Sequence, residues 1–245
     1  MLYIYHLILY RPLLNILIFF YNTIAFQDLG LAIIFLTLLI RLILFPIFQK
    51  STRQQLVMQR LQPKIKQVQD NHRGDREKQT QAIMALYKEH GVNPFSGFLL
   101  LLIQLPILIA LYQIFLKSLN SGFLEGLYGF LRVPEFINPT LLGLINLKER
   151  SILIVGLAAL AQYFQGLLAL PKIAADQKPA PAEKLSRQMV FVGPLITVAI
   201  FYNLPAAIGL YWVVSSLFSI FQQLLINRQT KTTNGKLGTF SKKDN

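Results

Sequence analysis

Long apolar runs separated by polar segments dominate the chain. Five of them, at residues 29–48, 95–116, 151–170, 189–202 and 205–226, have the character of membrane spans. A helix needs about 20 apolar residues to cross the hydrocarbon core of a bilayer, and only the fourth run is clearly shorter. Asn203 and Leu204 leave room for no more than a tight turn between the last two runs. The pattern predicts an all-α integral membrane protein with five transmembrane helices.

Basic residues concentrate in three of the segments between these runs. Residues 49–94, 171–188 and 227–245 hold most of the 24 Lys and Arg residues of the chain. Lys and Arg close to span ends stay on the cytoplasmic side of a membrane. We therefore expect an outside N-terminus and a cytoplasmic C-terminus. The chain then divides into an extracytoplasmic segment (1–28), a five-span core (29–226) and a basic cytoplasmic tail (227–245) that we expect to be disordered.

The first 28 residues hold a further apolar stretch, interrupted by Arg11 and Pro12. Proline suits the first turn of a helix because its missing N–H is not needed there. We expect residues 12–26 to form a helix that lies in the outer membrane interface. The alternative is a sixth span over residues 2–26, which are apolar enough to cross.

The long polar segment 49–94 has helical periodicity of its own. Val57, Leu61, Ile65 and Val68 recur at helical spacing, a polar turn follows at residues 70–75, and a second apolar stripe runs over residues 83–87. Gly91 is placed to end the second helix. The pattern predicts a cytoplasmic hairpin of two antiparallel helices over 49–94, with a pair of helices lying flat on anionic headgroups as the alternative. Segment 172–188, rich in Ala and Pro, is expected to be mobile.

Composition narrows the function. Hydrophobic residues make up 53% of the chain and charged residues 14%, whereas a soluble domain is about a quarter charged. The absence of cysteine excludes disulfides, thiolate nucleophiles and Cys-based zinc sites. The three His residues are scattered, and no hydrolase, metalloprotease or nucleotide-binding motif occurs. We expect neither an enzyme nor a cofactor or metal site. The net charge of +13 fits cytoplasmic loops and anionic lipid, and we expect no sequence-specific nucleic-acid binding.

Arg41 is the one charged residue well inside a predicted span. A bare charge at the centre of a membrane helix costs at least about 2.5–3.5 kcal/mol, and all acidic residues fall outside the five spans. Arginine near a span end can snorkel to the nearer interface. Helical side chains lean toward the N-terminus, however, which here points away from the cytoplasm. We therefore expect water to reach Arg41 inside the protein.

Neutral polar residues on four of the spans point to a shared cavity around Arg41. Each of them alone is explained by hydrogen bonding between packed helices, but together they predict a polar groove. Its expected lining is Arg41, Thr37, Gln104, Gln162, Gln165, Trp212, Ser215, Ser219 and Gln222. The basic segments place the mouth of this groove on the cytoplasmic side.

Several of these segments resemble one known family. The stretches are residues 38–46 (LLIRLILFP), 61–65 (LQPKI), 84–88 (MALYK), 92–97 (VNPFSG), 102–107 (LIQLPI), 209–215 (GLYWVVS) and 218–223 (FSIFQQ). In this order they resemble the YidC/Oxa1/Alb3 family of membrane protein insertases, over roughly residues 10 to 228. The likeness is to a short bacterial-type member, without the large extracytoplasmic domain or the lipoprotein cysteine that other members carry.

The resemblance implies a function as well as a fold. It implies a five-span core around a hydrophilic groove that opens to the cytoplasm and to lipid, with an essential Arg at the position of Arg41. It implies a chaperone and insertase of the cell (inner) membrane, rather than of a thylakoid or mitochondrial membrane, whose clients are nascent membrane proteins. Membrane lipids, the ribosome, the signal recognition particle machinery and the Sec translocon are the implied partners.

Other functions use a similar polar groove. A small channel or carrier would need a path open to both sides, and a lipid scramblase would need a lateral groove. A purely structural subunit is a third alternative, for which the polar residues would serve helix packing only.

Overall fold

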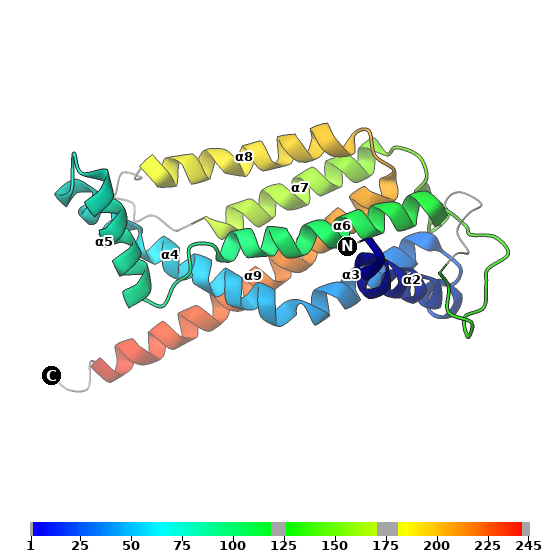
Figure 1. The fold of residues 1–245 in the computed structure, drawn as a ribbon, viewed down its shortest axis with the longest axis horizontal. Helices are drawn as coiled ribbons and strands as arrows, with labels where there is room; N and C mark the ends of the chain where they lie inside the picture. Colours follow the sequence, from blue (N-terminus) through cyan, green and yellow to red (C-terminus); the bar gives the residue numbers. More distant parts are fainter. Residues whose placement is uncertain (1, 119–125, 171–180, 242–245) are drawn as a thin grey trace.

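The computed structural model is almost entirely helical and describes residues 2–118, 126–170 and 181–241. In it α6 (Ser96–Ser118), α7 (Ile152–Ala169), α8 (Pro181–Phe201) and α9 (Ala206–Ser241) run lengthwise beside the bent pair α3 (Leu29–Ile43) and α4 (Phe45–Asn71), as Figure 1 shows. The helical hairpin of α4 and α5 (Arg76–Glu89) lies at the end of the bundle toward which α9 extends. The N-terminal helix and the turn between α8 and α9 lie at the other end.

Among the described residues, three helices are long and apolar enough to cross a membrane. They are Tyr3–Thr23, Ile152–Ala169 and Ala206–Arg228, and the α3–α4 pair gives a fourth if the bent pair is one span. Leu102–Lys117 and Arg187–Phe201 are shorter apolar helices. All five of the predicted apolar runs are thus helical. Within the described residues, two of the five qualify as spans by length and hydropathy, or three if the bent pair is one span, and Tyr3–Thr23 qualifies in addition to them.

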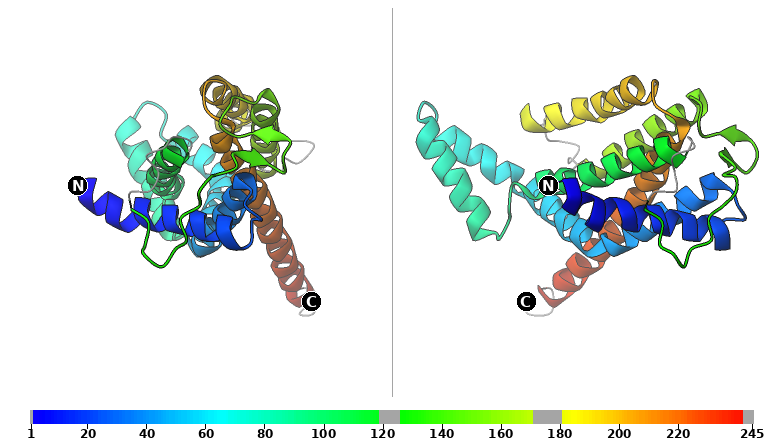
Figure 2. Two further views of the ribbon diagram at one scale, coloured as in Figure 1. Left: turned by 90° about the vertical axis from the view of Figure 1, so that its right-hand side faces the viewer. Right: turned by 45° about the vertical axis from the view of Figure 1, so that its right-hand side comes forward.

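The N-terminal helix begins earlier than the sequence pattern predicts. Helix α1 (Leu2–Tyr5), a π-helical turn η1 (His6–Tyr10) and α2 (Arg11–Thr23) follow one another without a break. Pro12 cannot donate to the carbonyl one turn before it, which favours the wider π turn at this place. The whole helix lies crosswise to the bundle axis (Figure 2, left), as a helix lying in the interface would.

The first predicted span is broken. Helix α3 ends at Ile43, and α4 leaves it at an angle of 64° after Leu44. The expected continuous helix over residues 29–48 is therefore wrong. The cause is Pro46, whose missing N–H cannot continue the hydrogen bonds of α3 but suits the first turn of a new helix, where it lies in α4.

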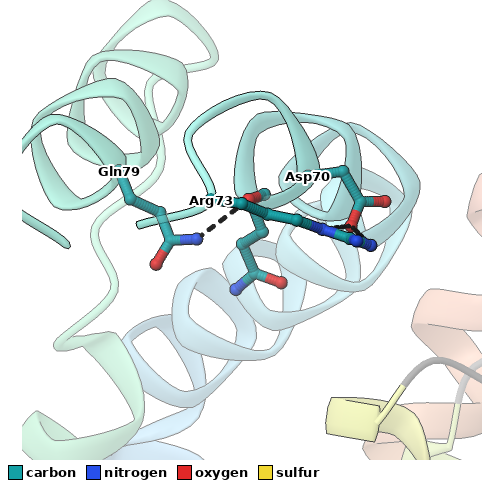
Figure 3. Close-up of polar contacts among 4 residues, drawn as sticks. Asp70, Arg73 and Gln79 are labelled. Atoms are coloured by element: carbon teal, nitrogen blue, oxygen red, sulfur yellow. Dashed lines mark hydrogen bonds and ion pairs between the residues drawn. The ribbon is translucent and has the colours of Figure 1, made fainter. Parts of the chain in front are cut away.

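The predicted hairpin is present as α4 and α5. Leu61, Ile65 and Val92 form a small core between the two helices, against which Val57 and Leu86 pack. The turn between the helices is held by Arg73, whose guanidinium lies 2.8 Å from the Asp70 carboxylate, and by Gln79, which donates to the Gln69 carbonyl at 3.1 Å (Figure 3). The apolar stripes thus pack against each other in this fold.

Helices α8 and α9 are longer than predicted. Helix α8 begins at Pro181, so residues 181–188 are helical, and the remainder of the segment expected to be mobile lies mostly outside the described residues. Helix α9 continues to Ser241, so the expected disordered tail is wrong for residues 227–241. This stretch includes Gly235 and Gly238 and four threonines, which have low helix propensity. Its helical form continues that of α9, an established helix that needs no new nucleus.

The main core fills the end of the bundle opposite the hairpin. It joins α2, α3 and α9 to parts of α6 and α7, and its fully buried members include Leu17, Ile33, Leu36, Phe115 and Tyr211. A two-stranded hairpin, β1 (Thr140–Leu141) and β2 (Ile145–Asn146), covers the start of α3. Asp28 caps α3 by accepting from Leu31 N at 2.8 Å, and its second oxygen accepts from Leu142 N at 2.6 Å.

Candidate functional site

A cavity of about 270 Å³ lies between the helices on the hairpin side of the main core. Helices α3, α4, α6, α7 and α9 all contribute to its wall. The lining residues are Arg41, Phe48, Thr52, Gln55, Leu100, Gln104, Gln165, Ala169, Trp212, Ser215, Ser216, Ser219, Gln222 and Gln223. No carboxylate is among these lining residues, and most of them carry neutral polar groups.

Arg41 is the only charged residue in this lining. The residue is 8% exposed, and neither its Nε nor its Nη1 atom has a hydrogen-bond partner. Its guanidinium lies over the ring of Phe48, with 4.6 Å between Cζ and the ring centroid. A buried cation with unused donors that faces a polar cavity is a site for an acceptor, whether water, a carbonyl or a carboxylate.

Helix α9 supplies the largest part of the polar wall. Trp212, Ser215, Ser219 and Gln222 recur at intervals of three and four residues, so that they share one face of the helix. Ser219 Oγ donates to the Ser215 carbonyl at 3.0 Å. Gln222 Nε2 donates to the carbonyl of Phe45 at 3.1 Å and so ties α9 to the bend that carries Arg41.

Helices α6 and α7 complete the wall with one glutamine each. Gln104 of α6 donates to the hydroxyl of Tyr211, a fully buried residue of α9. Gln165 of α7 is half-buried and lies one turn before Ala169. The wall is therefore built by helices that are far apart in sequence and held together partly by side-chain hydrogen bonds.

Two residues predicted for the groove do not line it. Thr37 is 1% exposed and donates to the Ile33 carbonyl at 2.6 Å, within its own helix. Gln162 accepts hydrogen bonds from Thr197 of α8 and, at 3.4 Å, from Trp212 Nε1. Thr37 is part of the packed region beyond the cavity. Gln162 joins α7, α8 and α9 through its hydrogen bonds, which is the helix-packing role expected for a polar residue taken alone.

The wall formed by α4 was not among the residues predicted for the groove. Phe48, at the predicted end of the first span, and Thr52 and Gln55, beyond that end, line the cavity. Thr52 and Gln55 follow Phe48 at intervals of four and three residues, which places the three on one face of α4. This spacing is the feature of the sequence from which these three residues could have been predicted.

The cavity does not continue through the main core. One turn beyond Arg41 toward the N-terminus of α3, Thr37, Leu36 and Ile33 are each at most 1% exposed. The polar lining is thus confined to the half of the bundle that faces the hairpin.

Comparison with known proteins gives this architecture a family. A family model described as 60Kd inner membrane protein matches residues 19–234. The chain belongs to this family. Family membership confirms the resemblance carried by the sequence motifs, and with the helical structure it identifies a multi-pass membrane protein.

Proteins similar to this chain carry the name of a membrane protein insertase. Proteins called "Membrane protein insertase YidC" from Francisella tularensis subsp. novicida (strain U112) and subsp. tularensis (strain WY96-3418) are each 35% identical over 211 residues. The match covers 84% of this chain but only 34% of each relative, so the chain spans about a third of their length.

A solved structure supports the same fold. It is described as "Active YidC insertase crystal structure with the first transmembrane domain resolved", and it matches with a TM-score of 0.59 and 26% identity. The match covers 86% of this chain and 45% of that one. The fold is YidC-like, and the cavity around Arg41 lies within it.

Proposed function

We propose that this protein is a membrane protein insertase and chaperone that works through the cavity around Arg41. The observation that carries the proposal is the buried guanidinium, which lacks hydrogen-bond partners at Nε and Nη1 and faces a cavity lined by neutral polar groups. The names of its relatives support the same function. The action is physical, with no covalent step and no cofactor.

The proposed topology has five spans with the N-terminus outside and the C-terminus in the cytoplasm. The spans are those of the sequence analysis, with the first reduced to α3 and the bend, and with 1–28 as an extracytoplasmic interfacial segment. The crosswise N-terminal helix supports the interfacial location (Figure 2). The basic hairpin and the end of α9 share one end of the bundle (Figure 1), which the positive-inside rule assigns to the cytoplasm.

The cavity must be wet for Arg41 to remain charged. Burial of an unpaired arginine in a membrane costs at least about 2.5–3.5 kcal/mol. The contact with the Phe48 ring returns about 2 kcal/mol in such a site, and the lining of the cavity holds no carboxylate to supply the rest. Water molecules, which take about 30 Å³ each in the liquid, fit several at a time into a cavity of about 270 Å³.

A wet cavity in the cytoplasmic half shortens the dry path for a client. Taking a polar segment across about 30 Å of hydrocarbon strips water from its charges and its backbone. Within the cavity, Arg41 attracts acidic or carbonyl groups of the client, while the polar face of α9 and Gln104 and Gln165 offer hydrogen bonds. The packed core beyond Thr37 keeps the outer side closed.

The driving force comes from the client itself. Its apolar span leaves the groove sideways into lipid, and the burial of that span in hydrocarbon is favourable by about 0.8 kcal/mol for each CH₂ group. No nucleotide site is required for such a step. Nascent membrane proteins are therefore the proposed clients, in the inner membrane of the cell.

The hairpin and the basic tail are the proposed contact surfaces for other partners. Both are rich in Lys and Arg, and such surfaces attract ribosomal RNA or acidic protein through charge, without reading a base sequence. The ribosome, the signal recognition particle machinery and the Sec translocon are the partners that we propose for them.

Replacement of Arg41 tests the mechanism. In cells depleted of their own insertase, the wild type and the variants Arg41→Lys, Arg41→Ala and Arg60→Ala would be compared for insertion of a single-span client with an acidic N-terminal tail. We expect Arg41→Ala to abolish most insertion and Arg41→Lys to keep part of it. Arg60→Ala, which removes an exposed cation of α4 outside the cavity, should insert like the wild type.

The same preparation separates the rival functions. Equal insertion by the wild type and Arg41→Ala contradicts the groove mechanism and favours a structural subunit. Ion flux through protein in liposomes without a client identifies a channel or carrier, and flip-flop of a fluorescent lipid identifies a scramblase.

A further inference from the structure

A second pocket, of about 300 Å³, lies at the base of the hairpin and outside the groove. One face of α4 forms one wall, and the turn that ends α5 forms the other. Its lining residues are Pro46, Gln49, Lys50, Arg53, Gln54, Val57, His90, Gly91 and Val92. No residue is shared with the cavity around Arg41, and nothing in the proposed insertion mechanism uses this pocket.

The backbone around Gly91 is built to hold this shape. Gly91 has φ +62°, its N–H donates to the Lys88 carbonyl at 3.1 Å, and the N–H of Val92 donates to the Tyr87 carbonyl at 2.9 Å. These two bonds make a Schellman motif, which ends a helix in a defined geometry. Val92 is also buried in the small core of the hairpin, so the wall opposite α4 is fixed.

The pocket is cationic. Lys50 and Arg53 are exposed side chains within its lining, and no carboxylate is part of the lining. His90 brings a third cation, the Lys64 ammonium, close to the pocket through a hydrogen bond. Its Nδ1 lies 2.9 Å from the Leu86 carbonyl and therefore carries the proton, so its Nε2 accepts from Lys64 Nζ at 3.2 Å.

Exposed apolar side chains adjoin this cationic pocket. Ile47, next to Pro46 in the chain, is 40% exposed, and Phe95, just after the pocket's last residue, is 65% exposed. Beyond these residues the chain becomes the apolar helices α3 and α6. The pocket thus lies where a membrane-facing surface changes into a charged one.

We propose that this pocket binds the phosphate group of an anionic phospholipid of the cytoplasmic leaflet. Lys50 and Arg53 hold the phosphate oxygens, and Ile47 and Phe95 contact the acyl chains. A free phosphate ion offers the same oxygens but would leave the exposed apolar border without a partner, which favours the lipid. A bound headgroup fixes the base of the hairpin at the level of the lipid phosphates.

The test compares two double variants that lose the same charge. Lys50→Gln with Arg53→Gln alters the pocket, and Arg60→Gln with Lys66→Gln removes two exposed cations of α4 outside it. The full chain, purified in detergent, would be titrated with phosphatidylglycerol and with phosphatidylcholine, and bound lipid would be counted by native mass spectrometry. Unchanged melting temperatures would establish that both variants are folded.

We expect phosphatidylglycerol to bind the wild type and the control variant equally well, and phosphatidylcholine to bind more weakly. The pocket variant should lose about 30-fold in affinity, since each basic residue near an anionic surface contributes about a fivefold factor. Equal affinity of the two double variants overturns the proposal. Displacement of the lipid by millimolar inorganic phosphate overturns the lipid assignment and makes the pocket a free phosphate site.

Discussion

The guanidinium of Arg41 lies over the ring of Phe48, 4.6 Å from its centroid, across the break between α3 and α4. The two residues are seven positions apart, a spacing that would place them on one face of an unbroken helix, but the helix axis turns by 64° between them. Pro46, which breaks the helix, thereby sets the angle at which the ring meets the cation. The contact between Arg41 and Phe48 therefore links the bend between α3 and α4 to the lining of the cavity.

Phe48→Leu tests what this contact contributes. The change keeps an apolar side chain but removes the negative face of the ring, which stabilises a cation by about 0.5–2 kcal/mol. We expect client insertion to fall by about two- to thirtyfold, less than the loss from Arg41→Ala. Phe45→Leu is the control, because its ring contacts Phe218 and not Arg41. Equal losses from the two variants would show that the aromatic packing of the bend, and not the cation, matters.

Water access to the cavity is measurable with single cysteines, because the chain has none of its own. We expect a membrane-impermeant maleimide to label Ser219→Cys in inverted vesicles at least tenfold faster than in right-side-out cells. Ile33→Cys, at a position that is 0% exposed in the main core, should react from neither side. Rapid labelling of Ser219→Cys from the outside would contradict a closed outer half.

Local patterns were enough to predict the helices and much of the cavity. The spacing of Trp212, Ser215, Ser219 and Gln222 places them on one face of any helix, and the isolation of Arg41 is visible in the sequence. These features depend only on periodicity and composition, which is why the structure agrees with them.

The predictions that were wrong or incomplete concern features that depend on contacts between distant segments or on a single proline. The wall formed by Thr52 and Gln55 was missed because a polar segment was assigned wholly to the hairpin. Gln162 was assigned to the groove because nothing in the sequence shows that Thr197, 35 positions later, takes its carbonyl. The hydrogen bonds between Asn15 of α2 and the backbone of Gly126 and Tyr128 could not be predicted for the same reason.

Asn15 is expected to hold the outer loop in place. The residue is 3% exposed; its Nδ2 donates to the Gly126 carbonyl at 2.9 Å, and its Oδ1 accepts from Tyr128 N at 2.7 Å. Asn15→Ala leaves Tyr128 N without its partner and Gly126 O with only the longer bond from Arg11 Nε at 3.4 Å, and a buried group without its partner costs about 1–3 kcal/mol. We expect a lower melting temperature and faster proteolysis within residues 126–138.

Asn22→Ala is the matched control for that loop. Asn22 Nδ2 also donates to a loop carbonyl, that of Arg132 at 2.6 Å, but in an exposed position. Water replaces such a bond, so the change should cost less than about 0.5 kcal/mol. If Asn22→Ala destabilises the protein as much as Asn15→Ala, burial of the bond is not what holds the loop.

The hairpin should show a pH dependence at the start of α5. Asp75 caps this helix by accepting from Lys78 N at 3.0 Å, and that hydrogen bond, with the Lys78 ammonium nearby, lowers the pKa of the Asp75 carboxyl. A carboxyl whose pKa is lowered by folding stabilises the folded state above its unfolded pKa of about 3.9. The stabilisation is lost as the pH falls through the lower, folded value.

Hydrogen exchange of the first turn of α5 measures this effect. In the wild type, amide protection corrected for intrinsic rates should be constant above about pH 5 and fall at lower pH. Asp75→Asn also caps a helix but does not titrate, so its protection should be independent of pH. A parallel decline in both proteins would assign the effect to other carboxyl groups.

Close packing of α7 on α9 requires glycine at position 209. A Cβ atom there would lie 2.6 Å from Cγ2 of Ile154, a β-branched side chain that is only 2% exposed and has little freedom to turn away. Overpacking of this kind costs about 1–3 kcal/mol, so Gly209→Ala should lower the melting temperature. Gly156→Ala, in α7 where a Cβ meets nothing within 4 Å, gains the same helix propensity without the clash.

Both variants replace a helical glycine, so the difference between their melting temperatures reports the cost of the steric clash with Ile154. Ile154→Ala removes the methyl group in the way, so it should be less destabilising in the Gly209→Ala background than in the wild type, a coupling that a double-mutant cycle measures. Purely additive effects would mean that α7 and α9 shift apart to accept the methyl group. The helices that carry Gln165 and Trp212 would then be less rigidly placed around Arg41, and insertion should fall even in the folded variant.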